Sequence, residues 1–480
     1  MPKLKTLLTA MFLATGGFLF GYDSGIITST IGQTEFIKYF SEPNDSVTGG
    51  IVSSFQGGAI LGTIINIFTG DRLGRKWSVF VGSCISCFGC ALQAGSINLV
   101  MLIIGRFIAG VAVGMLTSVI PMYAGEIAEA SSRGMMSGLL QWMLSWGFLC
   151  AQWLGYGCSF NDTAFQWRFP LAFQCVPGLA LASGVLFLNE SPRWLMEKDR
   201  HEEALVSLRN LHGDGTPETA QYIELELQEI RETIQAERLH TAITLTSILR
   251  KPSWRRRLIL GCAVQAFGVL SGINVINYYG TRIYATLGFD TQMSLMIIGI
   301  SGALSIIYCT GGLWALERVG RIKPLIFSAA GMAGALVCNA AMSQHWNDGN
   351  QNQLRAMVAM NFVFNFFYTF VGIISWVYPA EIFPVDIRNQ GNSITTFTNW
   401  TLNLVLAQVS PNALSSIGFS YFYVFFVLNL IAMLCYIFFF PETQGKTLEQ
   451  MDSLFGDETF VSAENEKKEI EAVMVEDVSK

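Results

Sequence analysis

The amino-acid sequence predicts an all-α membrane protein of twelve transmembrane helices, arranged as two pseudo-symmetric six-helix halves. Composition indicates the membrane class, because 51% of the 480 residues are hydrophobic and only 14% are charged. Soluble proteins carry roughly 25% charged residues. The apolar residues come in blocks of about 20, the helix length that crosses about 30 Å of hydrocarbon. A duplication along the chain indicates the two halves.

The duplication is visible in three charged motifs that lie on short loops between apolar blocks. The pairs have offsets of 246, 255 and 252 residues and keep the same order along the chain: 71–75 with 317–321, Glu126 and Arg133 with Glu381 and Arg388, and Glu190 with Glu442. Matched motifs in the same order indicate two homologous halves. Duplicated halves in a membrane protein are typical of transporters in which one half rocks against the other.

Six spans can be placed in each half. Their expected centres are Gly17, Leu61, Cys87, Gly110, Ser145 and Leu179, followed by Val269, Leu304, Gly334, Phe364, Leu402 and Leu428. The first apolar run is long enough to be a span itself, so we do not expect a cleaved signal peptide. We expect residues 1–188 and 257–440 to form the halves. Residues 189–256 form a cytoplasmic loop with short helices, and residues 441–480 form a cytoplasmic tail.

The distribution of basic residues predicts the orientation. Of the 30 Lys and Arg residues, 25 lie on the termini and on the loops of the same side, and four lie on the opposite loops. Because loops rich in Lys and Arg stay in the cytoplasm, we expect both termini and the repeated loops to be cytoplasmic. The plasma membrane is the expected location. The sequons at Asn44 and Asn161 then fall on exterior loops and are candidate glycosylation sites.

The repeated loops are predicted to form a cytoplasmic gate. Enforcing topology would explain their basic residues, but it explains neither the acidic residues nor their recurrence. We therefore expect charge pairs between the halves to hold this face shut and to break when it opens. The candidate gate residues are Asp71, Arg72, Arg75, Glu126, Arg133, Glu190, Glu317, Arg318, Arg321, Glu381, Arg388 and Glu442.

Asp23 is the most informative single residue, because it lies inside the first predicted span. A carboxylate at that depth is costly, so it should be paired, protonated or facing water. Arg106, in the fourth span, is the other strong charge well inside the first half. A pair between them can be a static link between two helices, or a site whose strength changes when the carboxylate takes a proton.

Together these motifs resemble the sugar porter family of the major facilitator superfamily, particularly its fungal members. The resemblance covers roughly residues 8 to 450, and its motifs stand at 70–76, 105–107, 121–126, 190–195 and 441–448. It implies a twelve-helix fold and transport by alternating access. Proton-coupled members pair an Asp at the position of Asp23 with the Arg of span four, whereas passive members often carry Asn there. The resemblance therefore favours proton coupling through Asp23 and Arg106.

The resemblance also implies a substrate site between the halves near the midplane. The matching residues are Gln141, Gln265, Asn274, Trp376, Asn399 and Trp400. The chain departs from the family where two residues expected as Gln are Gly268 and Val269, where an expected Asn is Ser305, and where 372–375 lacks a Pro. Each lost amide removes partners that a buried sugar hydroxyl needs, at about 1–3 kcal/mol. A hexose, a disaccharide, a polyol, a cyclic acid such as quinate and a secondary metabolite remain open.

The remaining classes are disfavoured. The sequence shows no nucleophile–base set, phosphate loop or basic tract, so we expect neither an enzyme nor a nucleic-acid partner. We expect no cofactor beyond the proton gradient, and no metal site. Cys84, Cys87 and Cys90 step along one predicted helix, which favours packing over zinc binding. The expected partners are a small-molecule substrate, protons and the lipid bilayer. A passive sugar facilitator, an exporter of a secondary metabolite and a non-transporting nutrient sensor are the alternatives to proton-coupled uptake.

Overall fold

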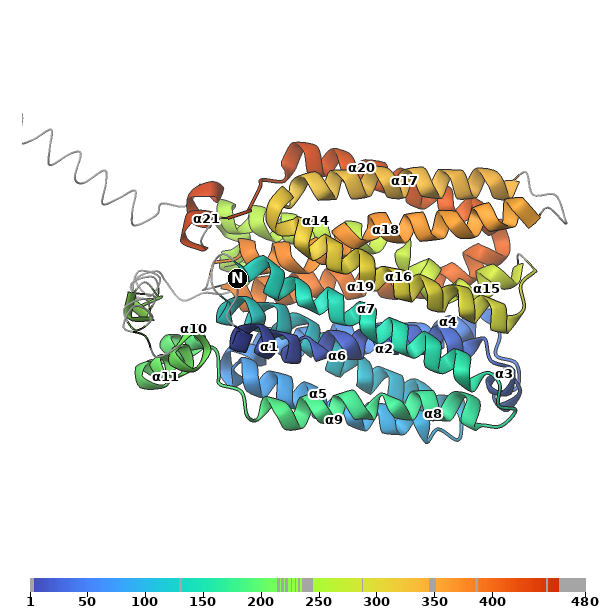
Figure 1. Ribbon diagram of the computed structural model, residues 1–480, viewed down its shortest axis with the longest axis horizontal. Helices are drawn as coiled ribbons and strands as arrows, with labels where there is room; N and C mark the ends of the chain where they lie inside the picture. Colours follow the sequence, from blue (N-terminus) through green and yellow to red (C-terminus); the bar gives the residue numbers. More distant parts are fainter. Residues whose placement is uncertain are drawn as a thin grey trace, which may run out of the picture.

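The computed structural model shows an elongated bundle of helices packed in two groups (Figure 1). The described residues are 4–128, 132–213, 216, 220, 223–225, 227–228, 230–231, 234, 245–286, 288–344, 351–384, 387–445 and 448–456. Residues 457–480 of the expected tail therefore lie outside the described part of the chain. The end of the bundle that carries α1, α10, α11 and α21 is called the charged end below, and the other is called the opposite end.

The first group holds the six spans of the first half. They are α1 (Leu4–Leu13) with α2 (Thr15–Ile31), α4 (Asp45–Leu73), α5 (Arg75–Ala94), α6 (Leu99–Ile127), α7 (Arg133–Cys158), and α8 (Phe165–Phe173) with α9 (Cys175–Val185). A short helix, α3 (Thr34–Tyr39), lies at the opposite end. The described linker contains α10 (Pro192–Glu197), α11 (His201–His212) and α13 (Leu245–Arg250).

The second group holds the other six spans. They are α14 (Pro252–Leu270) with α15 (Ile273–Thr286), α16 (Thr291–Val319), α17 (Ile322–Gln344), α18 (Gln351–Ile382), α19 (Arg388–Ile417) and α20 (Tyr421–Phe439). The short turn η3 (Gly418–Ser420) joins the last two, and α21 (Leu448–Phe455) follows. Every expected centre falls within one of the twelve spans, which confirms the predicted fold class.

A count by length and hydropathy alone is lower. Among the described residues, nine helical segments are long and apolar enough to cross a membrane. One of these segments, Arg388–Phe439, contains both α19 and α20. Neither α7 nor the α8–α9 segment is among the nine. Counting α19 and α20 as two spans, and adding α7 and the α8–α9 segment, gives the twelve spans of the bundle.

Two helices end at matching glycines at the charged end. Gly74 ends α4 with a φ of +86°, and Gly320 ends α16 with a φ of +92°, in the left-handed region that favours glycine. A Cβ atom at either position would also lie within 2.6 Å of a carboxylate oxygen of Glu190 or Glu442. Each loop thus needs a glycine both for its turn and for its acidic partner.

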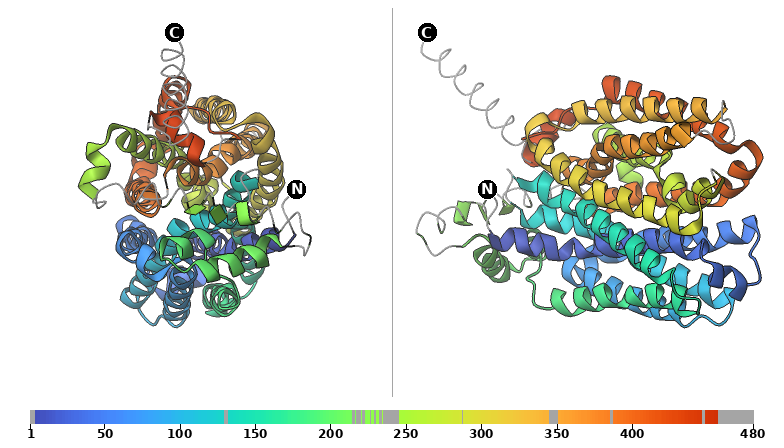
Figure 2. Two further views of the ribbon diagram at one scale, coloured as in Figure 1. Left: turned by 90° about the vertical axis from the view of Figure 1, so that its left-hand side faces the viewer. Right: turned by 45° about the vertical axis from the view of Figure 1, so that its right-hand side comes forward.

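The halves meet along a central interface (Figure 2). Across it α4 packs on α19, and α7 packs on α16 and α18. Within the first half, glycines allow α4 and α6 to approach until Cβ atoms would meet backbone carbonyls; these are Gly58, Gly62, Gly110 and Gly114. The seventh span is broken at Gly272, which has a φ of +99°. Broken helices at membrane depth are typical of a site that lines a cavity.

Candidate functional site

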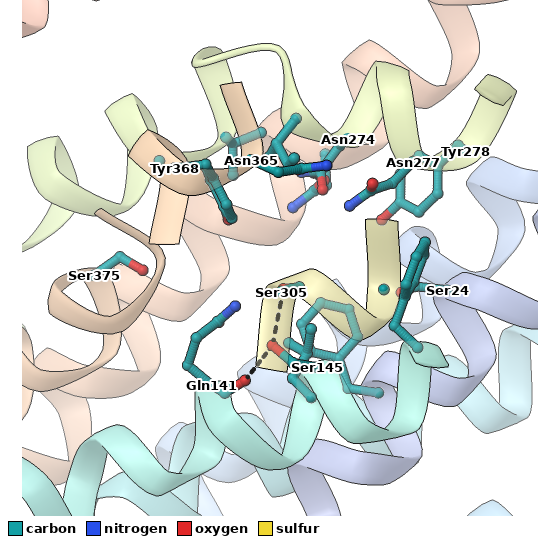
Figure 3. A pocket seen from close by; sticks show the side chains of 18 of the residues that line it. Ser24, Gln141, Ser145, Asn274, Asn277, Tyr278, Ser305, Asn365, Tyr368 and Ser375 are labelled. Carbon is teal, nitrogen blue, oxygen red and sulfur yellow. Dashed lines mark hydrogen bonds between the residues drawn. The ribbon is translucent and has the colours of Figure 1, made fainter. Parts of the chain in front are cut away.

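A polar cavity lies between the two halves. It has a volume of about 80 Å³, and because one water needs roughly 10–15 Å³, it can hold several waters or a small polar molecule. Its walls come from α2 and α7 in the first half and from α14, α15, α16, α18 and α19 in the second. Figure 3 shows its amide and hydroxyl side chains converging from opposite walls.

Four of the six expected substrate residues line this cavity: Gln141, Asn274, Trp376 and Asn399. The indole N–H of Trp376 donates to Oε1 of Gln141 at 3.1 Å, which links the two halves. Asn274 donates to Oδ1 of Asn403, another residue of the wall. These contacts hold the side chains in place before any substrate arrives.

Gln265 and Trp400 lie behind the wall. The Gln265 amide donates to the carbonyl of Ser375 at 2.8 Å and accepts from Asn399 at 2.7 Å. Trp400 is fully buried and donates to Thr117 of the other half at 3.3 Å. The structure therefore gives both residues supporting contacts rather than a place on the cavity surface.

Sequence reasoning missed much of the polar lining, including Ser24, Ser145, Asn277, Tyr278, Ser301, Asn365, Tyr368, Ser375 and Asn403. Helical spacing would have found some of them. Asn277 and Tyr278 follow Asn274 by three and four residues, and Asn403 follows Asn399 by four, so they share a helix face. Gly268, Val269 and Ser305, the departures from the family pattern, also line the cavity.

The expected ion pair is formed inside the bundle. Nη2 of Arg106 lies 3.3 Å from Oδ2 of Asp23, and both side chains are at most 2% exposed. Nε of Arg106 donates to the carbonyl of Ile51 at 2.8 Å, and its guanidinium lies over the ring of Phe55. Within the described residues, Oδ1 of Asp23 and Nη1 of Arg106 are buried without a close hydrogen-bond partner.

The ion pair adjoins the cavity. Ser24, the next residue after Asp23, and Tyr278 both line the wall. The residue that follows Asp23 in the sequence therefore contacts the cavity.

The charged end carries two matching clusters, one in each half. In the first, Arg75 pairs with Glu126 at 3.0 Å and with Asp71 at 3.3 Å. In the second, Arg321 pairs with Glu381 at 2.6 Å. Glu126 and Glu381 are nearly buried. The expectation that charge pairs join the halves is wrong for these pairs, because each links neighbouring helices of one half.

Glu190 and Glu442 repeat a second contact. The Glu190 carboxylate accepts backbone N–H groups of Arg75, Lys76 and Ser191 at 2.9–3.1 Å. The Glu442 carboxylate accepts those of Arg321, Ile322, Thr443 and Gln444. Each therefore holds the start of a helix, where unpaired N–H groups favour an anion. Burial raises the pKa of the Glu190 carboxyl, although those N–H donors and Arg75 oppose the shift.

Contacts between the halves at the charged end are mostly neutral. Asn66 donates to Asn389 at 3.3 Å and to Ser393 at 3.1 Å, and Gln390 donates to Asp71 at 3.3 Å. Arg388 lies 4.0 Å from Glu126 across the interface. The side chain of Arg133 lies outside the described part of the structure. Arg72 lies in the last turn of α4, and Glu317 and Arg318 lie in the last turn of α16, where Arg318 stacks over Trp314.

The halves also touch at the opposite end. Thr28 donates to the carbonyl of Asn277 at 2.5 Å, and Thr281 donates to the carbonyl of Thr28 at 3.4 Å. Ser53 donates to Gln408 at 2.8 Å. Contacts between the halves thus lie on both sides of the cavity.

Other candidate sites can be placed. Asn44 accepts the N–H of Val47 as the N-cap of α4, and Asn161 accepts from Thr163 at 2.7 Å. Both lie on loops at the opposite end. Within the described residues, no group of three or more His, Cys, Asp and Glu side chains is arranged to hold a metal.

Comparison with known proteins identifies the family. The family described as "Sugar (and other) transporter" matches residues 9–455. The chain belongs to this family. It is 37% identical to the MFS-type transporter criB of Aspergillus cristatus, over 92% of this chain and 91% of that one. It is 31% identical to a high-affinity glucose transporter of Kluyveromyces lactis, over 95% of this chain and 86% of that one.

A solved structure gives the same fold. The proton:xylose symporter XylE, bound to 6-bromo-6-deoxy-D-glucose, superposes with a TM-score of 0.82. That alignment covers 94% of this chain and 99% of XylE, which is an E. coli protein, at 24% identity. The major facilitator fold expected from the sequence is therefore confirmed, and this member of the family is a multi-pass membrane protein.

Proposed function

We propose that this protein imports a neutral, polyhydroxylated solute, a sugar or a close relative of one, together with protons. It works by alternating access in the plasma membrane, with both termini in the cytoplasm. The observation that carries the proposal is the buried pair of Asp23 and Arg106 beside the cavity. The names of the two relatives support transport of a small molecule, and the glucose transporter supports a sugar.

The cavity favours an uncharged substrate. Its described lining holds amides, hydroxyls and aromatic rings, without an Asp, Glu, Lys or Arg side chain. Burying an ionised carboxylate against such a wall is costly unless a cation compensates it. Amides and hydroxyls pair well with sugar hydroxyls, because each offers both a donor and an acceptor or can rotate to do so.

The proton acts at Asp23. While the carboxylate is charged, it attracts Arg106 and ties α2 to α6. Loading a proton on the carboxylate removes that attraction and releases the guanidinium toward its other contacts. Tyr278 transmits the change, because it lines the cavity together with Ser24, the neighbour of Asp23, and belongs to α15, the helix that touches α2 through Thr28. Substrate binding at α15 and proton binding at α2 thereby favour the same rearrangement.

The gate opens when the charged end of one half slides past the charged end of the other half, while each half stays rigid. Ion pairs inside each half keep the helices of that half together. The described contacts between the halves at this end are hydrogen bonds, worth about 0.5–1.5 kcal/mol each, together with the 4.0 Å approach of Arg388 to Glu126. A few such bonds can break in one transport cycle, whereas losing one partner of a buried ion pair costs about 3–5 kcal/mol.

The test is uptake in a yeast strain that lacks its own sugar transporters and expresses the full chain. Labelled hexoses, pentoses, polyols and quinate are supplied with and without a protonophore. One proton moved through 100 mV is worth about 2.3 kcal/mol, so we expect roughly 50-fold accumulation that the protonophore abolishes. Asp23→Asn should retain equilibration and lose accumulation.

Each contrary outcome has a defined meaning. Uptake that never exceeds the outside concentration and ignores the protonophore would replace symport with passive facilitation. Efflux of a preloaded solute without any uptake would indicate an exporter. Binding of a sugar by the purified protein without transport in proteoliposomes would indicate a sensor. Selective uptake of quinate would overturn the neutral substrate.

A further inference from the structure

A second cavity lies at the charged end, between the spans of the first half and the linker, and is called the linker cavity below. Its volume is about 280 Å³, against about 80 Å³ for the cavity between the halves. Ligand sites in proteins begin at roughly 300 Å³, so the linker cavity is close to the size of a small-molecule site. Its walls come from α1, α6 and α11 and from residues 187–189, which follow α9.

The linker cavity lies where the spans of the first half end. Leu8 belongs to α1, at the start of the first span, and Phe187 follows α9, at the end of the sixth. Both are large apolar side chains that are exposed, Phe187 at 88% and Leu8 at 55%. The linker helix α11 lies beyond the ends of the spans (Figure 1) and forms the opposite wall. The linker cavity therefore has an apolar rim on the side of the spans, where lipid acyl chains run.

The polar side chains of the linker cavity can all donate hydrogen bonds. They are the ammonium group of Lys5, the hydroxyl of Thr9 and the amides of Asn189 and Asn210. Within the described residues, none of these four side chains makes a hydrogen bond to the protein. Their donors are therefore available to a bound molecule, and Lys5 adds a positive charge that favours an anion.

Acceptor groups around the same space are already occupied. Thr6 donates to the carbonyl of Leu211 at 3.1 Å, and the phenol of Tyr123 donates to the carbonyl of Asn189. The described lining includes no Asp or Glu side chain. The carboxylate of Glu190, the next residue, is held by backbone N–H groups at the start of α5. An anion in the linker cavity thus meets donors without a facing carboxylate.

A second cation adjoins the apolar rim. Nζ of Lys76 donates to the carbonyl of Leu186 at 2.8 Å, one residue before Phe187. Lysine is a common partner of phosphate, which it binds as a point charge. A molecule with a phosphate group and an apolar tail therefore matches both the charges and the rim.

We propose that the linker cavity binds one anionic glycerophospholipid. Its phosphate lies between Lys5 and the amides of Asn189 and Asn210, and its acyl chains run along Leu8 and Phe187. The bound lipid joins α1 to α11 and so holds the linker against the first half. The choice of leaflet rests on the proposed orientation, in which the charged end faces the cytoplasmic leaflet, where anionic lipids are found.

Native mass spectrometry of the purified full chain in detergent measures the binding. The protein is titrated with dioleoylphosphatidylglycerol and, separately, with dioleoylphosphatidylcholine, which has the same acyl chains and a neutral head group. One phosphatidylglycerol should be retained per chain. Two lysines, each contributing about fivefold in affinity near an anionic group, predict a preference of roughly 25-fold over phosphatidylcholine.

Three variants assign that preference to the linker cavity. Lys5→Gln should weaken phosphatidylglycerol binding by about fivefold and leave phosphatidylcholine binding unchanged. Lys323→Gln is the matched control, because Lys323 is also an exposed lysine at the charged end, at the start of α17, and does not line the linker cavity. It should change neither affinity. Phe187→Ser removes an exposed side chain of the rim and should weaken both lipids alike.

The contrary outcomes are distinct. Equal affinity for the two lipids, or equal losses in Lys5→Gln and Lys323→Gln, would overturn the lipid site. Glycerol 3-phosphate that bound as tightly as phosphatidylglycerol would make the occupant a soluble phosphate and would also overturn it. Because the measurement needs no transport, lipid selectivity in a chain that moves no sugar would contradict only the proposed function. Sugar transport by a chain without lipid selectivity would contradict only the lipid site.

Discussion

The two halves of this protein repeat each other at the charged end and differ at the midplane. At the charged end, Arg75–Glu126 in the first half matches Arg321–Glu381 in the second. At the midplane, Asp23 and Arg106 have no charged counterparts. The 255-residue offset of the gate motif carries Arg106 onto Asn361, whose amide bonds to Tyr284 at 3.1 Å and accepts from Asn339 at 2.9 Å.

The difference assigns separate tasks to repeated and unrepeated residues. A transporter whose halves rock about a central site needs both halves to be rigid in the same way. The duplicated ion pairs at the charged end provide this rigidity in each half. The proposed coupling and selectivity require asymmetry, because in that proposal one proton site and one substrate site serve both halves. The buried charge pair at the midplane belongs to the first half, and most of the amides on the cavity wall belong to the second.

The largest expected effect tests the midplane difference. Arg106→Met leaves the Asp23 carboxylate buried without its cation, which should reduce the free energy of unfolding by about 3–5 kcal/mol. Asn361→Leu, at the matching position, breaks only neutral hydrogen bonds and should cost about 1–3 kcal/mol. Thermal unfolding of the purified proteins in detergent measures both.

A double variant provides the internal control. Asp23→Asn combined with Arg106→Met removes both charges, so most of the stability lost in Arg106→Met should return. If Arg106→Met and Asn361→Leu were equally destabilised, or the double variant were no more stable than Arg106→Met, the charge asymmetry would not matter for folding.

The sequence was sufficient to locate the spans and the loops, but not to assign partners. The spans could be placed because most of them are long apolar blocks, whose position does not change with errors of a few residues. Partners depend on which neighbours pack together. Repeated charges are equally compatible with pairs inside a half and pairs between halves. The structure decides for pairs inside each half, because α5 packs on α6 and α17 on α18.

The direction of side chains is a second feature that the sequence alone did not predict. Gln265 and Gly268 are one turn apart on α14, yet Gln265 turns toward Asn399 and Ser375 while Gly268 opens to the cavity. A motif matches positions, and it does not give the rotation of a broken helix about its axis. The same limit hid Asn365 and Ser301, which face each other from two helices and belong to no recognised motif.

A smaller effect tests the repeated ends. Glu126→Gln and Glu381→Gln each weaken one buried pair, so both should lower thermal stability by similar amounts, about 3–5 kcal/mol. Within the described side chains, Glu126 also faces a cation of the other half, Arg388 at 4.0 Å. Glu126→Gln should therefore also shift the balance between open and closed states, by about fivefold, near 1 kcal/mol.

Thiol labelling reports that balance. A cysteine placed at Ser375, in a chain without its native cysteines, should react faster from the cytoplasmic side in Glu126→Gln than in the same chain with Glu126. Equal labelling rates would mean that the 4.0 Å approach between the halves contributes nothing to closure.

The smallest effect concerns the neutral contacts between the halves on either side of the cavity. Asn66→Ala removes hydrogen bonds to Asn389 and Ser393 at the charged end, and Ser53→Ala removes one to Gln408 at the opposite end. Each bond is worth about 0.5–1.5 kcal/mol, so each substitution should shift the open-to-closed ratio by about two- to tenfold. The shifts should have opposite signs, because Asn66→Ala favours opening toward the cytoplasm and Ser53→Ala favours opening outward.

Labelling of the Ser375 cysteine from the two sides distinguishes the two shifts. If both substitutions accelerated labelling from the same side, these contacts would not be the ones that close the two ends. Closure would then depend on the helix packing of α4 on α19 and of α7 on α16.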